Sequence, residues 1–240
     1  MHSVWPHIVY GLLAAGFCGD MPEMQRYVPL SVRGVVMLGD QSISSVDEFA
    51  ACHTLEELAA LAVECRRCAL RNGCSGVVFG KGYAHAKLMF IGEGPGAEED
   101  RQGLPFVGAA GQLLDKIIAA AGFSMQEVYI ANIVKCRPPG NRVPARDEAD
   151  ACKPWLSKQI DLISPRIIVL LGAVALQNMI DHDARITKMR GKWIHREGIE
   201  FMPTYHPAAL LRDETKKRPV WEDIKQVRDR YHHLFGKPGE

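Results

Sequence analysis

The stretch from Leu88 to Leu114 constrains the fold of this chain more than any other. It begins with an apolar run at 88–91 that is typical of a buried strand, passes glycines at 92, 94 and 96, and re-enters an apolar helix near Val107. A strand that leads through a glycine-rich loop into a helix is the α/β way of placing chemistry at the carboxyl edge of a sheet. The loop also carries acids and one aromatic ring: Glu93, Glu98, Glu99, Asp100 and Phe106.

The rest of the chain alternates strand and helix patterns. Further strands are predicted at 128–134, 166–171 and from 201 to 204, and helices at 46–64, 113–121, 147–163, 173–180 and from Pro219 onward. Strands that alternate with helices indicate a parallel sheet covered on both faces. We therefore expect an α/β fold, a three-layer αβα arrangement with a central, mostly parallel four-stranded sheet, in one domain from about residue 46 to 240.

Residues 1–45 form an N-terminal extension of unknown role. Their apolar run at 7–18 is too short to span a bilayer, and it lacks the cationic flank and cleavage site of a signal peptide. No membrane segment is therefore expected. Three interpretations stay open: an added strand or helix pair, a poorly ordered extension, or a misassigned start whose true initiator is Met24 or Met37.

The overall composition is that of an ordinary globular protein. Hydrophobic residues make up 47% and charged residues 24% of the chain, so disorder is not expected. The formal net charge of +1 neither requires nor excludes a nucleic-acid partner, because a local basic patch can exist within a balanced total.

The cysteines are spaced like ligands rather than like a secreted disulfide scaffold. Cys65 and Cys68 form a C-x2-C motif, Cys136 follows the strand at 128–134, and Cys152 comes later. Four thiolates suit either zinc or a [4Fe–4S] cluster, and the residues alone leave these two near even. Buried or redox-active cysteines are the ordinary alternative, since a single C-x2-C is a weak signal.

The loop GEGPGA, residues 92–97, fits the G-x-G-x-x-A dinucleotide pattern. Glu98, Glu99 and Asp100 argue against that function, because they would crowd the place of a pyrophosphate with like charge. Glycines beside acids better suit the close approach of a substrate, with one carboxylate to handle water or a developing cation. At least two of the three acids are explained by the preference of acids for a helix N-terminus.

Three further side chains fall at predicted strand ends or in the glycine loop, each with an ordinary structural alternative. Phe106 is either a core residue or a ring with one face open for stacking. Asn132 is the single polar side chain in its strand, and it either caps a turn or offers a donor and an acceptor to a pyrimidine edge. His206 is either a satisfied core histidine or a donor to an oxyanion.

A wedge and a basic rim are predicted around these groups. We expect Leu210 and Leu211 to face outward beside Arg212, as suits insertion into a base stack. The basic rim comprises Lys135, Arg137, Arg142, Arg146, Arg212, Lys216, Lys217 and Arg218. A stacking ring, an amide, a histidine and a carboxylate at one sheet edge, ringed by cations, suit a flipped base whose glycosidic bond is to be cut.

Four segments of the sequence resemble the family 4 uracil-DNA glycosylases, the iron–sulfur type of the uracil-DNA glycosylase superfamily. They are GEGPGAEEDRQGLPFVGAAGQLLD, YIANIVKCRPPGNRVPARDEADACKPWL, PRIIVLLGAVAL and PTYHPAALLR, in the same order as in the family. The resemblance runs from about Cys65 to Arg212, and residues 1–45 lie outside it.

The resemblance implies a role for each matching residue. It implies a structural [4Fe–4S] cluster on Cys65, Cys68, Cys136 and Cys152. It assigns uracil recognition to Phe106, Asn132, Gly94 and Gly96. It assigns catalysis to Glu93 and His206, with Glu99 and Asp100 as alternatives for the catalytic acid. The DNA-facing and wedge residues are Arg142, Pro207, Leu210, Leu211 and Arg212.

The sequence differs from related glycosylases at two places, and each difference leads to an expectation about the reaction. Gly94 and Gly96 stand where relatives of other families have an aspartate and a tyrosine, so neither side chain is available. The PPGNR loop, residues 138–142, lacks the histidine insert of a covalently trapping relative, so turnover is expected. With no amine nucleophile evident, we expect a monofunctional enzyme that leaves an abasic site without cutting the strand.

The resemblance also implies a setting. The expected partner is uracil-containing DNA, single- or double-stranded. The protein is expected to be a monomer in the cytoplasm, associated with the nucleoid, and a replication-clamp or polymerase contact is unproven. The rival from another class is a catalytically silent DNA-binding or polymerase-associated module on the same fold. A nucleotide-cofactor enzyme is a second rival, disfavoured by the acids of the loop.

Overall fold

The structure is a computed structural model, and it describes Phe49 and residues 51–236. All of these lie in one compact unit, Leu38–Glu240. The expectations for residues 1–45, and for the start of the helix predicted at 46–64, lie outside the described residues. The domain boundary near residue 45 therefore stays a prediction. Within the described part of the chain, no helix is both long and apolar enough to cross a bilayer.

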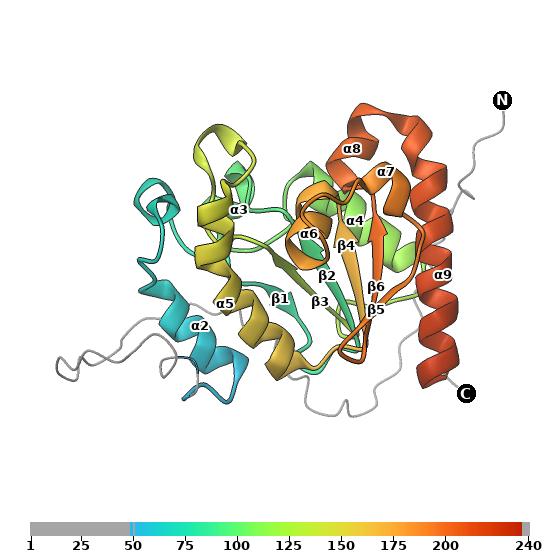
Figure 1. Cartoon of the computed structure of the whole chain (residues 1–240), viewed down its shortest axis with the longest axis horizontal. Coiled ribbons are helices and arrows are strands. Elements are labelled where there is room, and N and C mark those ends of the chain that lie inside the picture. Colours follow the sequence, from blue (N-terminus) through green and yellow to red (C-terminus); the bar gives the residue numbers. More distant parts are fainter. Residues whose placement is uncertain (1–48, 50, 237–240) are drawn as a thin grey trace, which may run out of the picture. The chain divides into compact units, whose positions relative to one another are not determined.

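A six-stranded sheet lies at the centre of the fold, in the order β1-β3-β2-β4-β6-β5 (Figure 1). Its four inner strands are parallel: β2 (Leu88–Gly92), β3 (Val128–Asn132), β4 (Ile167–Leu171) and β6 (Ile199–Thr204). Every residue of β2, β3 and β4 is buried, as expected for strands covered on both faces. The predicted parallel α/β sheet is confirmed.

Two short antiparallel strands extend the four that were predicted. They are β1 (Lys81–Gly82), which pairs with β3, and β5 (Ile194–Arg196), which pairs with β6. Neither carries an apolar run, so hydrophobic periodicity could not reveal them. Each covers an outer strand, which protects the edges of the parallel sheet.

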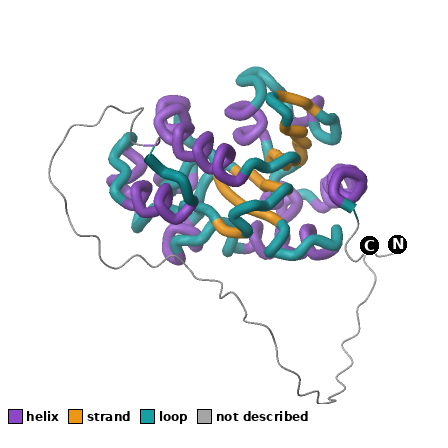
Figure 2. Tube along the Cα trace, turned by 90° about the horizontal axis from the view of Figure 1, so that it is seen from below, coloured by secondary structure: helices purple, strands orange, loops and turns teal. Residues whose placement is uncertain are grey.

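Helices cover both faces of the sheet, and Figure 2 shows the strands lying between them. One core cluster joins α2 (Leu55–Val63), α5 (Arg146–Ile163) and α6 (Ala173–Met179) to strand residues such as Ile91 and Ala131. The other joins α4 (Ala109–Ala120), α8 (Pro207–Arg212) and α9 (Lys217–Phe235) to the alternate strand residues. This alternation between the two clusters gives the three layers that were predicted.

Short helices complete the chain between these layers. They are η1 (Ala69–Gly73), α3 (Ala97–Gln102), η2 (Pro139–Asn141), α7 (Ile186–Met189) and η3 (Glu214–Lys216). Within the segment predicted as a helix at 46–64, residues 51–54 are not helical and α2 begins at Leu55. Thr54 and Glu57 form a reciprocal capping box there: each side chain accepts the other residue's backbone N–H.

Candidate active site

The candidate active site lies at the carboxyl ends of the four parallel strands. The last paired residues are Gly92 with Asn132, and Leu171 with Thr204. From β2 the chain proceeds to β3 on one side and later to β4 on the other, so the strand order reverses at β2. In open α/β sheets, ligands bind in the crevice beyond the strand ends at such a reversal.

Gly92 brings two of the predicted uracil-binding residues together. A Cβ placed on Gly92 would lie 2.5 Å from Oδ1 of Asn132 and 2.5 Å from Cζ of Phe106. Both side chains therefore press on the same glycine, which must lack a side chain here. Asn132 is 2% exposed, and its buried Oδ1 accepts no hydrogen bond from the described residues. A buried amide oxygen without a donor is rare in proteins, and a ligand that supplies an N–H would satisfy it.

The backbone of Phe106 is held in an unfavourable conformation. Its φ is 52°, in the left-handed region that bulky residues avoid. Oε1 of Glu99 accepts the N–H groups of Val107 and Gly108 at 2.9 and 2.8 Å, and Nζ of Lys81 donates to the Phe106 carbonyl at 3.0 Å. Gly111 in α4 lies so close that a Cβ there would overlap that carbonyl. These contacts fix the direction of the Phe106 ring, which is 5% exposed.

His206 approaches the same ring from β6. The Phe106 and His206 ring centroids are 5.6 Å apart with an angle of 32° between the planes. The side chain of His206 caps α8: Nδ1 accepts the backbone N–H of Ala208 at 3.2 Å, so the neutral ring carries its proton on Nε2. Burial, and then the positive charge of Arg212, lower the pKa of His206 to about 4. At neutral pH the ring is therefore an uncharged N–H donor.

The four loop acids have clearly different surroundings. Glu98 forms an exposed pair with Arg101, and Asp100 accepts the backbone N–H and the hydroxyl of Ser75, both at 2.9 Å. Glu99 caps α3 and holds the loop at Phe106. The half-buried carboxyl of Glu93, directly after Gly92, makes no hydrogen bond or ion pair within the described residues, and burial raises its pKa above the ordinary value. Glu93 is therefore the acid left available for chemistry.

The two further glycines of the loop are close to their neighbours. A Cβ on Gly94 would lie 2.7 Å from Cγ2 of Val134, and one on Gly96 would lie 2.8 Å from Oε2 of Glu99. A side chain at either place would push aside the Val134 side chain or the Glu99 carboxylate that holds the loop. This explains in physical terms why glycines stand there.

The four predicted cluster ligands line one cavity between α2, η1, the loop after β3 and α5. Cys65, Cys68, Cys136 and Cys152 all contribute to its wall, together with apolar residues such as Leu70 and Trp155. Among the described residues, no three His, Cys, Asp or Glu side chains come together as the ligands of a single metal ion would. A four-iron cluster needs a wider spread, because each of its thiolates binds a different iron.

Two of the four sulfurs accept hydrogen bonds, whereas burial disfavours the charged thiolate form. Nε1 of Trp155 donates to Sγ of Cys65 at 3.2 Å, and the backbone N–H of Lys135 donates to Sγ of Cys152 at 3.3 Å. Burial raises the pKa of Cys136 and of Cys152, the latter to about 11. A bound metal centre would supply the positive charge that these buried thiolates need. The donor set therefore fits a four-thiolate cluster.

Comparison with known proteins places the chain in a family. The sequence model described as the Uracil DNA glycosylase superfamily matches residues 79–225. A type-4 uracil-DNA glycosylase of Sulfurisphaera tokodaii is 43% identical over 73% of this chain and 84% of its own length. The corresponding protein of Thermotoga maritima is 42% identical over 73% of this chain and 96% of its own length. The chain belongs to the type-4 uracil-DNA glycosylases. The resemblance read from the four sequence segments is thereby confirmed.

A DNA polymerase of Bacillus phage SP01 is also similar to this glycosylase. The identity is 34% over 60% of this chain, but the match covers only 15% of the polymerase. The type-4 relatives match over most of their own length, and they do not favour the alternative of a silent polymerase-associated module.

The structure corrects two predictions about the DNA-facing surface of the glycosylase. Leu210 does not face outward: it is 2% exposed, because it lies on the inner side of α8 and joins the core with α4 and α9. Lys135 does not belong to the basic rim, since it is also 2% exposed. Its ammonium donates to the Asn132 carbonyl at 3.0 Å and to Oε1 of Gln159 at 2.5 Å.

The other predicted DNA-facing residues differ in exposure. Leu211 is 52% exposed, and Arg212 beside it is exposed as well, whereas Pro207 is buried at the first position of α8. Arg142 binds both carboxylate oxygens of Glu148 at 2.7 Å, with its own side chain 46% exposed. Leu211 and Arg212 are therefore the more accessible part of this surface.

Sequence reasoning missed the residues that hold the site in place. Lys81 and Gln159 lie far along the chain from the groups they contact, and no local pattern marks them. Glu99 did carry a signal, because an acid three residues after Gly96 at the start of a helix is typical of a capping position.

Proposed function

We propose that the residues gathered at the carboxyl edge of the sheet hydrolyse the N-glycosidic bond of a flipped-out deoxyuridine in DNA. The products are free uracil and an abasic site, and no strand is cut. The observation that carries this proposal is the contact of Asn132 and Phe106 at Gly92, with the His206 ring 5.6 Å from that of Phe106.

Asn132 and Phe106 would select the base. The unsatisfied Oδ1 of Asn132 would accept the N3–H of uracil, and its amide nitrogen would donate to O4. Cytosine presents the opposite pattern on this edge. Stacking on an aromatic ring contributes about 1–3 kcal/mol per base and would offset part of the cost of extruding the nucleotide.

His206 would stabilise the leaving group. As the bond between N1 and C1′ stretches, negative charge develops on uracil O2. The Nε2–H of a neutral His206 can donate to that oxygen, because Nδ1 is already occupied by the N–H of Ala208. One such pre-oriented donor is worth about 3–4 kcal/mol of transition-state stabilisation.

Glu93 would act on the sugar side. Its ionised carboxylate would balance the oxocarbenium charge and orient the attacking water, while Glu99 and Asp100 are committed to holding the loop. Burial raises the pKa of Glu93 above its ordinary value, and the positive charge that develops on the sugar would favour the ionised form.

A [4Fe–4S] cluster on Cys65, Cys68, Cys136 and Cys152 completes the proposal. The donor chemistry of the shared cavity supports it. The cluster would brace the loop after β3 and take no part in the bond cleavage. Gly94 and Gly96 would let the DNA backbone or the base approach the loop closely.

The proposal for DNA binding uses the exposed groups. Leu211 would fill the gap left by the flipped base, and Arg212, Arg142 and Pro207 would lie near the phosphates. The contribution of the two arginines to the DNA affinity should weaken as the salt concentration rises. We propose a monomer in the cytoplasm, associated with the nucleoid.

One assay tests this proposed function. Wild-type protein is incubated with an oligonucleotide that contains one uracil, and the products are treated with alkali. We expect a break at the uracil position only after alkali, and no break in the same oligonucleotide with thymine. His206→Ala should lower the single-turnover rate by about two orders of magnitude or more. An intact oligonucleotide with wild-type protein would refute the activity, and a wild-type rate in the variant would remove His206 from the site.

A further inference from the structure

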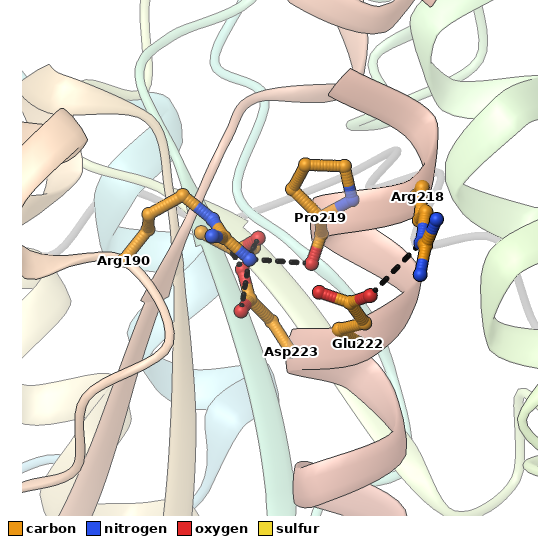
Figure 3. Close-up of polar contacts among 6 residues, drawn as sticks. Arg190, Arg218, Pro219, Glu222 and Asp223 are labelled. Carbon is orange, nitrogen blue, oxygen red and sulfur yellow. Dashed lines mark hydrogen bonds and ion pairs between the residues drawn. The ribbon is translucent and has the colours of Figure 1, made fainter. Parts of the chain in front are cut away.

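A buried ionic network lies behind His206, outside the groups used so far. Asp223 of α9 is 1% exposed, and Arg190, just after α7, binds it through Nη2 and Nε at 2.5 and 3.1 Å. Nη2 of Arg190 also donates to the Pro219 carbonyl at 2.6 Å, as Figure 3 shows. The network therefore joins α7 to the first turns of α9.

Thr204 connects this network to the sheet. Its hydroxyl donates to Oδ2 of Asp223 at 2.6 Å, and its carbonyl accepts the N–H of Gly172 at 2.9 Å. Thr204 is fully buried and is the last paired residue of β6. Beyond it the chain leaves the sheet and reaches His206 two residues later. The strand end is thus held on one side by β4 and on the other by α9.

The chain between Thr204 and His206 has little freedom. Two cations approach the Tyr205 ring, with Cζ of Arg190 and Nζ of Lys216 each 5.7 Å from its centroid. A Cβ on Gly172, whose φ is +93°, would lie 3.0 Å from Cβ of His206. A small shift of the strand end would therefore move the imidazole against β4 or away from it.

We infer that Thr204 and Asp223 are positioning residues for the reaction: their hydrogen bond, braced by Arg190, sets where His206 presents its Nε2–H. This inference rests on the proposed role of His206. Neither residue touches the substrate in this account. They act through two residues of backbone, so a loss of the Thr204 hydroxyl should slow bond cleavage without weakening DNA binding.

The test compares a substitution that keeps the shape of the threonine side chain with one that keeps its hydroxyl but loses a methyl group. Thr204→Val removes the hydroxyl, and Thr204→Ser keeps it. Glu222→Gln is the matched control, because Glu222 lies next to Asp223 in α9 and pairs with exposed Arg218 at 3.2 Å, away from the sheet (Figure 3). Thr204→Ala, which also lacks the hydroxyl, is the second variant should the valine protein not fold.

Three readouts separate positioning from simple destabilisation. They are the single-turnover excision rate at a temperature where circular dichroism shows each variant folded, the Kd for an oligonucleotide with a cleavage-resistant 2′-fluoro-deoxyuridine, and the ¹⁵N shifts of the His206 ring. We expect Thr204→Val to lose about 10- to 100-fold in rate, as for a displacement of up to about 1 Å, with an unchanged Kd and shifted His206 signals. Thr204→Ser and Glu222→Gln should behave like wild type.

Each other outcome overturns the inference. A wild-type rate in folded Thr204→Val shows that the hydroxyl does not position His206, and an equal loss in Thr204→Ser or Glu222→Gln assigns the effect to general destabilisation. Failure of the proposed function is distinguishable, since inactive wild-type protein, or an active His206→Ala, would refute the role of His206 itself whatever the Thr204 variants do.

Discussion

The buried amide of Asn132 shows how one residue type can mark a ligand site. Its Oδ1 presses on Gly92 without a donor from the described residues, although β3 is otherwise an apolar strand in a filled core. The sequence predicted this position, because a lone polar residue at the end of a buried strand must be satisfied by something. It could not predict the contact with Phe106, which lies across the loop.

Substitution of this amide should change base selection. In Asn132→Asp the donor to uracil O4 is lost, so excision from uracil should fall relative to excision from cytosine. We expect the ratio of the two rates to drop by about tenfold or more, since one mispaired edge costs about 1–3 kcal/mol. Parallel single-turnover assays on uracil and cytosine oligonucleotides measure it. An unchanged ratio would mean that Asn132 only supports the fold.

The lowered pKa of His206 should appear in the pH dependence of stability. In the folded protein the ring has a pKa of about 4, whereas the unfolded chain has the ordinary value of 6.5. Between these values the unfolded state binds more protons, so this residue makes the free energy of unfolding fall as the pH drops from about 6.5 to about 4. Urea unfolding at several pH values, compared with His206→Gln, isolates this contribution. An identical pH slope in the variant would contradict it.

At the scale of elements, the strongest patterns in the sequence were the most informative. The four parallel strands and the helices α5 and α9 followed from long apolar runs and helical spacing. The edge strands β1 and β5 did not, because they are two and three residues long and largely polar. Lys135 looked like a loop cation, but its ammonium can be buried because it donates to Oε1 of Gln159, on α5, and to the Asn132 carbonyl.

The short helix α8 gives a paired prediction. With only six residues, its sequence could not show which of two adjacent leucines faces the core. Leu211→Ala should reduce excision from duplex DNA more than from single strands, with little change in stability. Leu210→Ala should instead cost about 2–5 kcal/mol of stability, as for other buried leucines. Thermal melting and the two excision assays measure both, and the opposite assignment would refute the proposed wedge.

The [4Fe–4S] cluster can be tested through Cys136, which lies in the loop after β3. Purified wild-type protein should be brown, with visible absorbance from thiolate-to-iron charge transfer and iron that co-elutes with the chain. Cys136→Ala removes one ligand and should lose colour and iron. The matched control is Cys52→Ala, because Cys52 is buried elsewhere in the core and does not line the cavity. A colourless native protein that holds one zinc would overturn the cluster.

At the scale of the whole molecule, the site depends on every strand of the parallel sheet. Glu93 follows β2, Asn132 ends β3, Gly172 follows β4 and His206 follows β6. The sequence predicted the positions of Glu93, Asn132 and His206, because residues at the carboxyl ends of parallel strands share one edge. The sequence could not predict the distances between these residues, because they depend on packing between segments far apart in the chain. The same holds for the hydrogen bonds by which Lys81 and Glu99 hold the backbone at Phe106.

The structure of the protein with uracil bound tests this convergence most directly. We expect the base to stack on Phe106, with its N3–H on Oδ1 of Asn132 and its O2 facing Nε2 of His206. Glu93 should lie on the side where the sugar would be. A uracil bound elsewhere, or bound with Asn132 left unpaired, would refute the proposed site.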